Sequence, residues 1–142
     1  MSSPAQPSAG HRAIDHTADV AIELWAPDEA GLLIEGARAV IALLTEGAVL
    51  HASATRTLEL SGLDPEDRLV RWLSEVLYLA SSEGWLTTDA DLTLTGNALR
   101  GTLHGHPQGL GLLRTEIKAV TYHDLTLVRV PGRVRAQVVL DV

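Results

Sequence analysis

Two short polar segments contain the residues whose chemistry stands out in this chain. The segment 15–19 has the sequence Asp-His-Thr-Ala-Asp, and the segment 118–124 has the sequence Lys-Ala-Val-Thr-Tyr-His-Asp. Carboxylates and imidazoles close together can exchange protons or bind a metal ion. Both segments lie in strand-like, otherwise apolar sequence, where an ionisable group costs free energy unless it is paired or bound. They are therefore the first candidates for a functional site.

The first segment also has a purely structural interpretation, which is harder to give for the second. The segment 15–19 could be the turn that enters a strand, with its Asp and Thr side chains bonded to the local backbone. His123 and Asp124 interrupt an apolar strand, and such a pair could orient a neighbouring group or a ligand. The residue types alone leave these alternatives open.

The end of the sequence offers a third candidate. If the final strand runs to Val142, Asp141 lies beside the α-carboxylate, and two adjacent anions repel each other unless a cation is near. A divalent metal ion with oxygen ligands would satisfy them, and so would an arginine. A solvated terminus is the simpler alternative.

The elements that position these residues follow from hydrophobic spacing. Strands are expected where apolar residues alternate with polar ones, and helices where they recur every three to four residues after a capping residue. The expected order is a strand ending near residue 25, a helix from Asp28 to near Gly47, a strand at 54–60, a helix from Asp64 to Gly84, a hairpin turning at 96–97, a strand at 117–130, a turn at 131–132 and a strand at 134–142.

This order predicts an α+β fold in which two helices pack on one mostly antiparallel sheet. Residues 1–11 are expected to form a disordered tail, and residues 12–142 a single domain. The chain has no cysteine, which excludes disulfides and thiolate chemistry. No secretory signal or membrane-spanning segment is visible, so we expect a cytoplasmic protein that does not bind membranes.

Charge narrows the possible partners. The chain has 11 Lys and Arg against 18 Asp and Glu, a formal net charge of −7. Such a surface repels phosphate backbones as a whole, so sequence-independent nucleic-acid binding is disfavoured. Arg129, Arg133 and Arg135, with Lys118 nearby in sequence, are interpreted as a solvated edge, with a local basic patch as the alternative.

Taken together, these segments resemble the archease family, small proteins that activate the tRNA-splicing RNA ligase. The resemblance rests on His-Thr-Ala-Asp-Val at residues 16–20, on the heptapeptide 118–124, and on the penultimate Asp141 with one apolar residue behind it. The order and separation of these motifs fit the family from about Arg12 to Val142. Between residues 52 and 113 the agreement is one of pattern more than of identity.

The resemblance implies a strand-helix-strand-strand type of core with a divalent metal ion, typically calcium, bound at one tip. The family's ligands correspond to Asp19, Asp141 and Val142, the last through its carboxylate or a main-chain oxygen. Magnesium and manganese remain open as the metal. Further residues of the motifs are expected beside the metal ligands or facing a partner protein: Asp15, His16, Lys118, His123 and Asp124.

The resemblance also implies a partner and a role. The partner is a GTP- and metal-dependent RNA ligase, which joins RNA ends bearing a 2′,3′-cyclic phosphate or 3′-phosphate to a 5′-hydroxyl. The family member promotes guanylylation and multiple turnover of that ligase without being an enzyme itself, and meets RNA only indirectly.

Two other functions remain as alternatives. The first is a metal-dependent phosphoester hydrolase with His16 or His123 as general base, although the chain has no recognisable nucleophile elbow or phosphate-binding loop. The second is a plain binding module in which both polar segments are structural.

Overall fold

The structure, a computed structural model, describes residues 8–15 and 19–142. Their elements, in chain order, are β1 (Gly10–Asp15), β2 (Asp19–Ala26), α1 (Glu29–Thr45), β3 (Ala54–Ser61), α2 (Pro65–Glu83), β4 (Leu86–Thr95), β5 (Ala98–His106), the 3-10 turn η1 (Leu110–Leu112), β6 (Ala119–Val130) and β7 (Arg133–Asp141).

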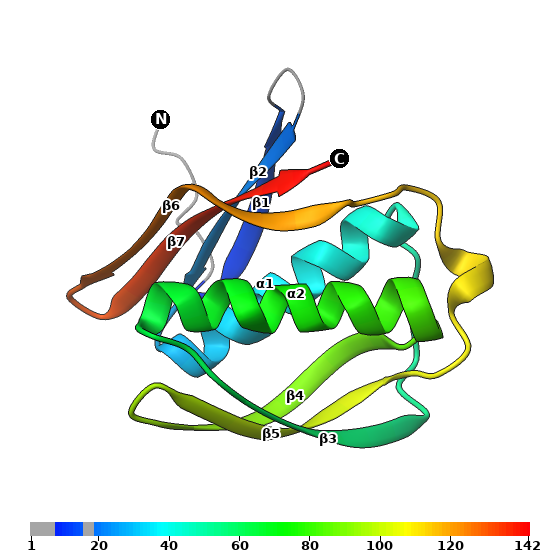
Figure 1. Cartoon of the computed structure of the whole chain (residues 1–142), viewed down its shortest axis with the longest axis horizontal. Coiled ribbons are helices and arrows are strands. Elements are labelled where there is room, and N and C mark those ends of the chain that lie inside the picture. The colour runs from blue at the N-terminus through cyan, green and yellow to red at the C-terminus, as the bar shows by residue number, and fades with distance from the viewer. Residues whose placement is uncertain (1–7, 16–18) are drawn as a thin grey trace, which may run out of the picture.

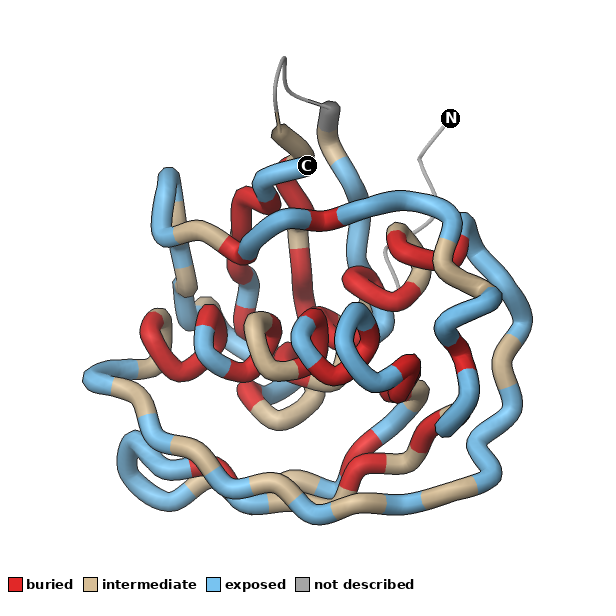
Figure 2. The backbone as a smooth tube through the Cα atoms, turned by 45° about the vertical axis from the view of Figure 1, so that its right-hand side comes forward, coloured by how far each residue is buried: buried red, intermediate tan, exposed pale blue. Residues whose placement is uncertain are grey.

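The described strands form two antiparallel sheets with the helices between them. Sheet A has the strand order β1-β2-β7-β6, and sheet B has the order β3-β5-β4. Figure 1 shows α1 and α2 packed together between the two sheets, so the molecule has three layers. Buried residues concentrate on the helices and on the strand faces turned toward them (Figure 2).

The α+β class is confirmed, whereas the expectation of one sheet is wrong. The reason lies in the width of the apolar helix surfaces. Viewed along the axis of α2, its buried apolar residues cover roughly half of the helix circumference, with Val70 at one edge of this arc and Leu79 at the other. This is wider than the single stripe that a helix needs to cover one sheet. Each helix therefore buries one side against sheet A and the other against sheet B.

The expected helix boundaries are confirmed by their caps. The Oδ1 atom of Asp28 accepts a hydrogen bond from the Gly31 amide at 2.7 Å, and the Oδ1 atom of Asp64 accepts one from the Asp67 amide at 2.7 Å. The second helix ends at Gly84, whose φ of 71° is the left-handed conformation that favours glycine.

The expected turns and the final strand are also observed. The turn at 96–97 joins β4 to β5, and the turn at 131–132 joins β6 to β7. Alternate residues of β7 face the helices and are buried: Val134, Ala136, Val138 and Leu140.

The N-terminal boundary differs from the expectation. Strand β1 begins at Gly10, and Gly10 and His11 pair with Trp25 and Leu24 of β2. These two residues were expected in the tail, but they belong to sheet A because β2 offers them an open edge. Residues 1–7 lie outside the described part of the chain. Within that part, no helix combines the length and apolarity that a bilayer crossing requires.

Candidate metal centre at the tip of sheet A

The two acids expected to bind metal lie side by side at one end of sheet A. Asp19 opens β2 and Asp141 closes β7, and their Cα atoms are direct partners in the antiparallel register. The backbone carbonyl of Asp141 also accepts a hydrogen bond from the Lys118 amide at 2.7 Å, which fixes the end of β7 against the start of β6. We call this end of the sheet, with Asp19, Asp141 and Val142, the acidic tip.

The acidic tip has donors that suit a hard divalent cation. Directly opposed residues on antiparallel strands have Cβ atoms roughly 5 Å apart, and like charges in that position destabilise the sheet. A cation between Asp19 and Asp141 would offset this repulsion, and carboxylate oxygens are the ligands that calcium and magnesium prefer. Val142 follows Asp141 directly and could add a main-chain oxygen.

Two side chains do not complete a metal site. Among the residues that the structure describes, no three His, Asp or Glu side chains gather closely enough to hold a metal ion. A metal bound at the acidic tip would therefore need Val142, water or groups from a partner for the rest of its coordination shell.

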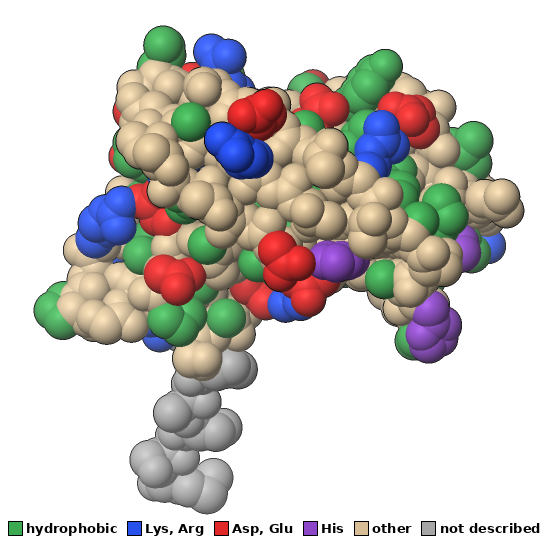
Figure 3. All heavy atoms as spheres, turned by 90° about the horizontal axis from the view of Figure 1, so that it is seen from below, with side chains coloured by type: hydrophobic (Ala, Val, Ile, Leu, Met, Phe, Trp, Pro, Cys, Tyr) green, Lys and Arg blue, Asp and Glu red, His purple; other side chains and the backbone are tan. Residues whose placement is uncertain are grey.

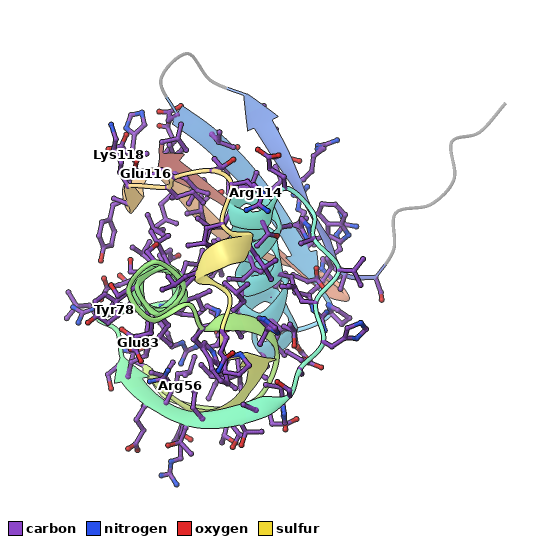
Figure 4. All side chains as sticks on the ribbon, turned by 90° about the vertical axis from the view of Figure 1, so that its right-hand side faces the viewer. Arg56, Tyr78, Glu83, Arg114, Glu116 and Lys118 are labelled. Atoms are coloured by element: carbon purple, nitrogen blue, oxygen red, sulfur yellow. The ribbon has the colours of Figure 1, made fainter. Side chains whose placement is uncertain are left out.

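The other expected site residues lie at the same end of sheet A where they can be placed. Asp15 closes β1 and pairs with Val20, one residue along β2 from Asp19. Lys118 is exposed beside the start of β6, on the side of the molecule that also carries Tyr78 of α2 (Figure 4). His16 lies outside the described residues.

His123 and Asp124 occupy a wide bulge in β6. Thr121 pairs with Val139 and Thr126 with Gln137, so the four residues 122–125 oppose the single residue 138 of β7. Asp124 has a φ of 50°, and the His123 Nε2 atom lies 3.2 Å from its carboxylate. This bulge explains why a polar pair can interrupt an apolar strand: both side chains leave the sheet and are exposed.

The bulge is tied to α2 through a contact that the sequence did not indicate. The hydroxyl of Tyr122 donates a hydrogen bond of 2.6 Å to Asp67. The other carboxylate oxygen of Asp67 accepts from the Leu63 amide and from the Arg71 guanidinium, both at 2.8 Å. Asp67 lies in the first turn of α2, and nothing local in sequence links it to a tyrosine 55 residues later.

The Asp67–Tyr122 bond gives a testable pH dependence. The Tyr122 hydroxyl, followed by the Leu63 amide and Arg71, lowers the pKa of Asp67 below its ordinary 3.8, and the bond to Asp67 raises the pKa of Tyr122 above 10. A lowered carboxyl pKa stabilises the fold above pH 3.8, and this stabilisation is lost as the pH falls through the folded-state value. The raised tyrosine pKa stabilises the fold below pH 10, and this is lost as the pH rises through the folded-state value.

Between about pH 4 and pH 10, Tyr122→Phe is therefore expected to have a lower free energy of unfolding than wild type. This difference should become smaller in acid and in strong alkali, where the hydrogen bond is lost from the wild type as well. Urea unfolding across the pH range measures that difference. A difference independent of pH would assign the effect to packing of the ring rather than to the hydrogen bond.

A buried ion-pair network holds the opposite end of the layers together, and it too was absent from the sequence interpretation. The guanidinium of Arg68 donates to Glu29 at 2.5 Å and to the carbonyls of Gly96 and Ala98 at 2.7 and 3.1 Å. Arg129 of β6 contacts the second carboxylate oxygen of Glu29. The network joins both helices to the β4–β5 turn and to sheet A, so it serves the fold rather than the acidic tip.

The structure is a small α+β domain with two helices between antiparallel sheets. Two acids pair where β2 begins and β7 ends, which gives the domain an oxygen-donor tip. The sequence description of the Archease protein family (MTH1598/TM1083) matches residues 11–142. The chain belongs to the archease family.

Individual relatives agree with this assignment. Protein archease from Methanopyrus kandleri is 33% identical over 134 residues, covering 90% of this chain and 96% of the relative. The solution structure of Methanobacterium thermoautotrophicum protein 1598 matches with a TM-score of 0.73 at 25% identity, over 94% of this chain and 99% of that one. The crystal structure of an archease from Thermotoga maritima, described as a possible chaperone, matches with a TM-score of 0.63 at 26% identity over the whole of both chains.

Proposed function

We propose that this protein is a cytoplasmic, metal-binding accessory protein that activates a GTP-dependent RNA ligase. The ligase joins 2′,3′-cyclic phosphate or 3′-phosphate ends to 5′-hydroxyl ends, as in tRNA splicing. This protein promotes guanylylation of the ligase and so allows multiple turnover. It performs no bond chemistry of its own.

The observation that carries the proposal is the opposition of Asp19 and Asp141 at the end of sheet A. These two acids are 122 positions apart in sequence, and each belongs to a motif on which the family resemblance rests. Their juxtaposition at an exposed end suits a role in which the protein presents a metal ion, or oxygen ligands for one, to an active site rich in cations. Calcium is the expected metal, with magnesium or manganese as substitutes.

The surroundings of the acidic tip support a protein partner. Lys118 is exposed just before β6, and His123 and Asp124 are exposed in the bulge of β6. The bulge lies opposite a residue only three positions from Asp141, roughly 10 Å along β7. The ligase could contact these side chains while the acidic tip reaches its active site. A hydrolase has weaker support, because His123 is 71% exposed and its described ion-pair partner is the adjacent Asp124.

The deciding experiment measures guanylylation of a cognate RNA ligase with labelled GTP, with and without this protein. Wild type is expected to raise both guanylylation and the number of ligation turnovers, whereas Asp19→Ala and Asp141→Ala are expected to abolish the stimulation. Glu59→Gln, which removes an exposed acid on sheet B, is the matched control and should stimulate normally. No stimulation by the wild type would overturn the proposal. Phosphoester hydrolysis by the protein alone, lost in His123→Ala, would favour the hydrolase.

A further inference from the structure

The face of sheet A that is turned away from the helices carries a groove lined by arginines. The groove has a volume of about 340 Å³ and crosses all four strands near the β6–β7 turn. We call it the arginine groove, and its polar lining comes from Arg12, Glu23, Thr126, Arg133, Arg135 and Gln137. Nothing in the proposed activation of the ligase uses these residues.

The charges in the arginine groove do not cancel. Glu23 is the acid in its lining, and it already pairs with Arg12, whose Nε atom donates to it at 3.1 Å. Within residues 8–15 and 19–142, Arg133 and Arg135 make no ion pair with a carboxylate. Two uncompensated positive charges therefore share this face of a chain whose net charge is −7.

The donors of the arginine groove are arranged in a row. Arg133, Arg135 and Gln137 are alternate residues of β7, so their side chains leave the same face of the sheet, roughly 7 Å apart along the strand. Thr126 lies opposite Gln137 on β6 and extends the row sideways. Guanidinium groups bind phosphates through two parallel hydrogen bonds, and a regular row of them suits a ligand with regularly spaced phosphates.

We infer that the arginine groove binds the phosphate backbone of single-stranded RNA. More of the groove's lining surface is polar than apolar, and its row of side-chain donors fits a phosphodiester chain better than a peptide with apolar anchors. Direct contact with RNA goes beyond the indirect contact that the family resemblance implied, and it differs from the expectation drawn from the net charge. The expectation considered the surface as a whole, whereas folding gathers Arg133 and Arg135 on one face and engages the nearest acid with Arg12.

The position of the arginine groove adds a consequence that rests on the proposed function. Arg135 and Asp141 lie on the same face of β7, six residues or roughly 20 Å apart. An RNA strand held by the arginine groove could run along sheet A toward the acidic tip, and so toward the active site of the ligase. RNA binding itself does not depend on the ligase.

The test is fluorescence anisotropy of a short labelled oligouridylate with the full-length protein alone, across a series of sodium chloride concentrations. Each phosphate contact contributes about −0.7 to the slope of log K against log salt for a single strand. In the double variant Arg133→Ala/Arg135→Ala, the negative slope is expected to become less steep by about 1.4, because two phosphate contacts are lost. This variant is also expected to bind RNA at least about tenfold more weakly at low salt.

The matched control is the double variant Arg100→Ala/Arg114→Ala, which removes the same charge elsewhere. Arg100 lies on the outer face of sheet B, where its Nε atom is 3.4 Å from the Glu59 carboxylate, and Figure 3 shows acidic and basic side chains scattered over this side of the molecule. The control is expected to bind like wild type. Equal weakening of both double variants, or no RNA binding by wild type, would overturn the inference. The inference would also be overturned if polyglutamate at equal charge concentration displaced the RNA, because the arginine groove would then be a site for acidic peptides.

Discussion

Asp141→Asn is expected to weaken calcium binding by at least about tenfold while leaving the metal-free protein as stable as wild type or slightly more so. The loss of affinity follows from removing one of the two carboxylate side chains that we propose as ligands. The unchanged or higher stability follows because the substitution also removes the repulsion between Asp141 and Asp19, since directly opposed like charges destabilise a sheet.

Thermal unfolding with and without calcium chloride measures both effects. Calcium at a hundred times its dissociation constant should stabilise wild type by about 2.7 kcal/mol, and Asp141→Asn should lose most of that increment. Glu59→Gln, with the same change in charge on the far sheet, should keep it. If Asp141→Asn instead destabilises the metal-free protein and retains the calcium effect, Asp141 is structural and the plain binding module becomes the better interpretation.

A second variant tests the role of Val142. Extending the chain by one glycine moves the α-carboxylate away from Asp141 while keeping the main-chain carbonyl of Val142. Calcium affinity should fall if the carboxylate is the ligand, and should stay unchanged if the main-chain oxygen is.

Arg68→Ala is expected to destabilise the fold by about 3–5 kcal/mol, because it leaves a buried carboxylate and two carbonyls without their shared cation. Arg68 is 3% exposed and Glu29 8% exposed, so water cannot replace the lost contacts at small cost. The contact between Arg129 and Glu29 is retained in the variant and reduces the destabilisation. The cavity left by the truncated side chain increases it.

Differential scanning calorimetry should show the melting temperature falling by roughly 10–20 °C for Arg68→Ala. Arg100→Ala, which breaks the exposed pair with Glu59, should change the stability by less than about 1 kcal/mol. If the melting temperature of Arg68→Ala falls no further than that of Arg100→Ala, the buried network contributes no more to stability than an exposed ion pair does.

The features of the fold that could be predicted from the sequence are those determined by residues close together in the chain, such as helix ends and the buried face of a strand. Asp28, Asp64 and Gly84 mark helix ends because capping depends on residues within one turn. The alternation in β7 identifies its buried face for the same reason.

The parts that were missed depend on contacts between distant segments. No local pattern says that β3 pairs with β5 in a sheet of its own, or that Tyr122 bonds to Asp67. Arg68 was not singled out because an arginine in a helix is normally a surface residue, and its burial follows only from the meeting of Glu29 and the β4–β5 turn. At the acidic tip, the residue types suggested ligands, while the pairing of Asp19 with Asp141 came from the family resemblance and from the fold.

The pairing of β2 with β7 has a consequence for synthesis on the ribosome. The helices and sheet B are built from residues 29–106, so they can pack as soon as those residues have emerged. Sheet A has to wait, because β2 is made early and its partner β7 is the last strand of the described chain. Until then the helix-facing residues Ile22 and Leu24 lack their neighbours in β7. A nascent or truncated chain without β7 thus has no acidic tip, because Asp19 then lacks its partner Asp141.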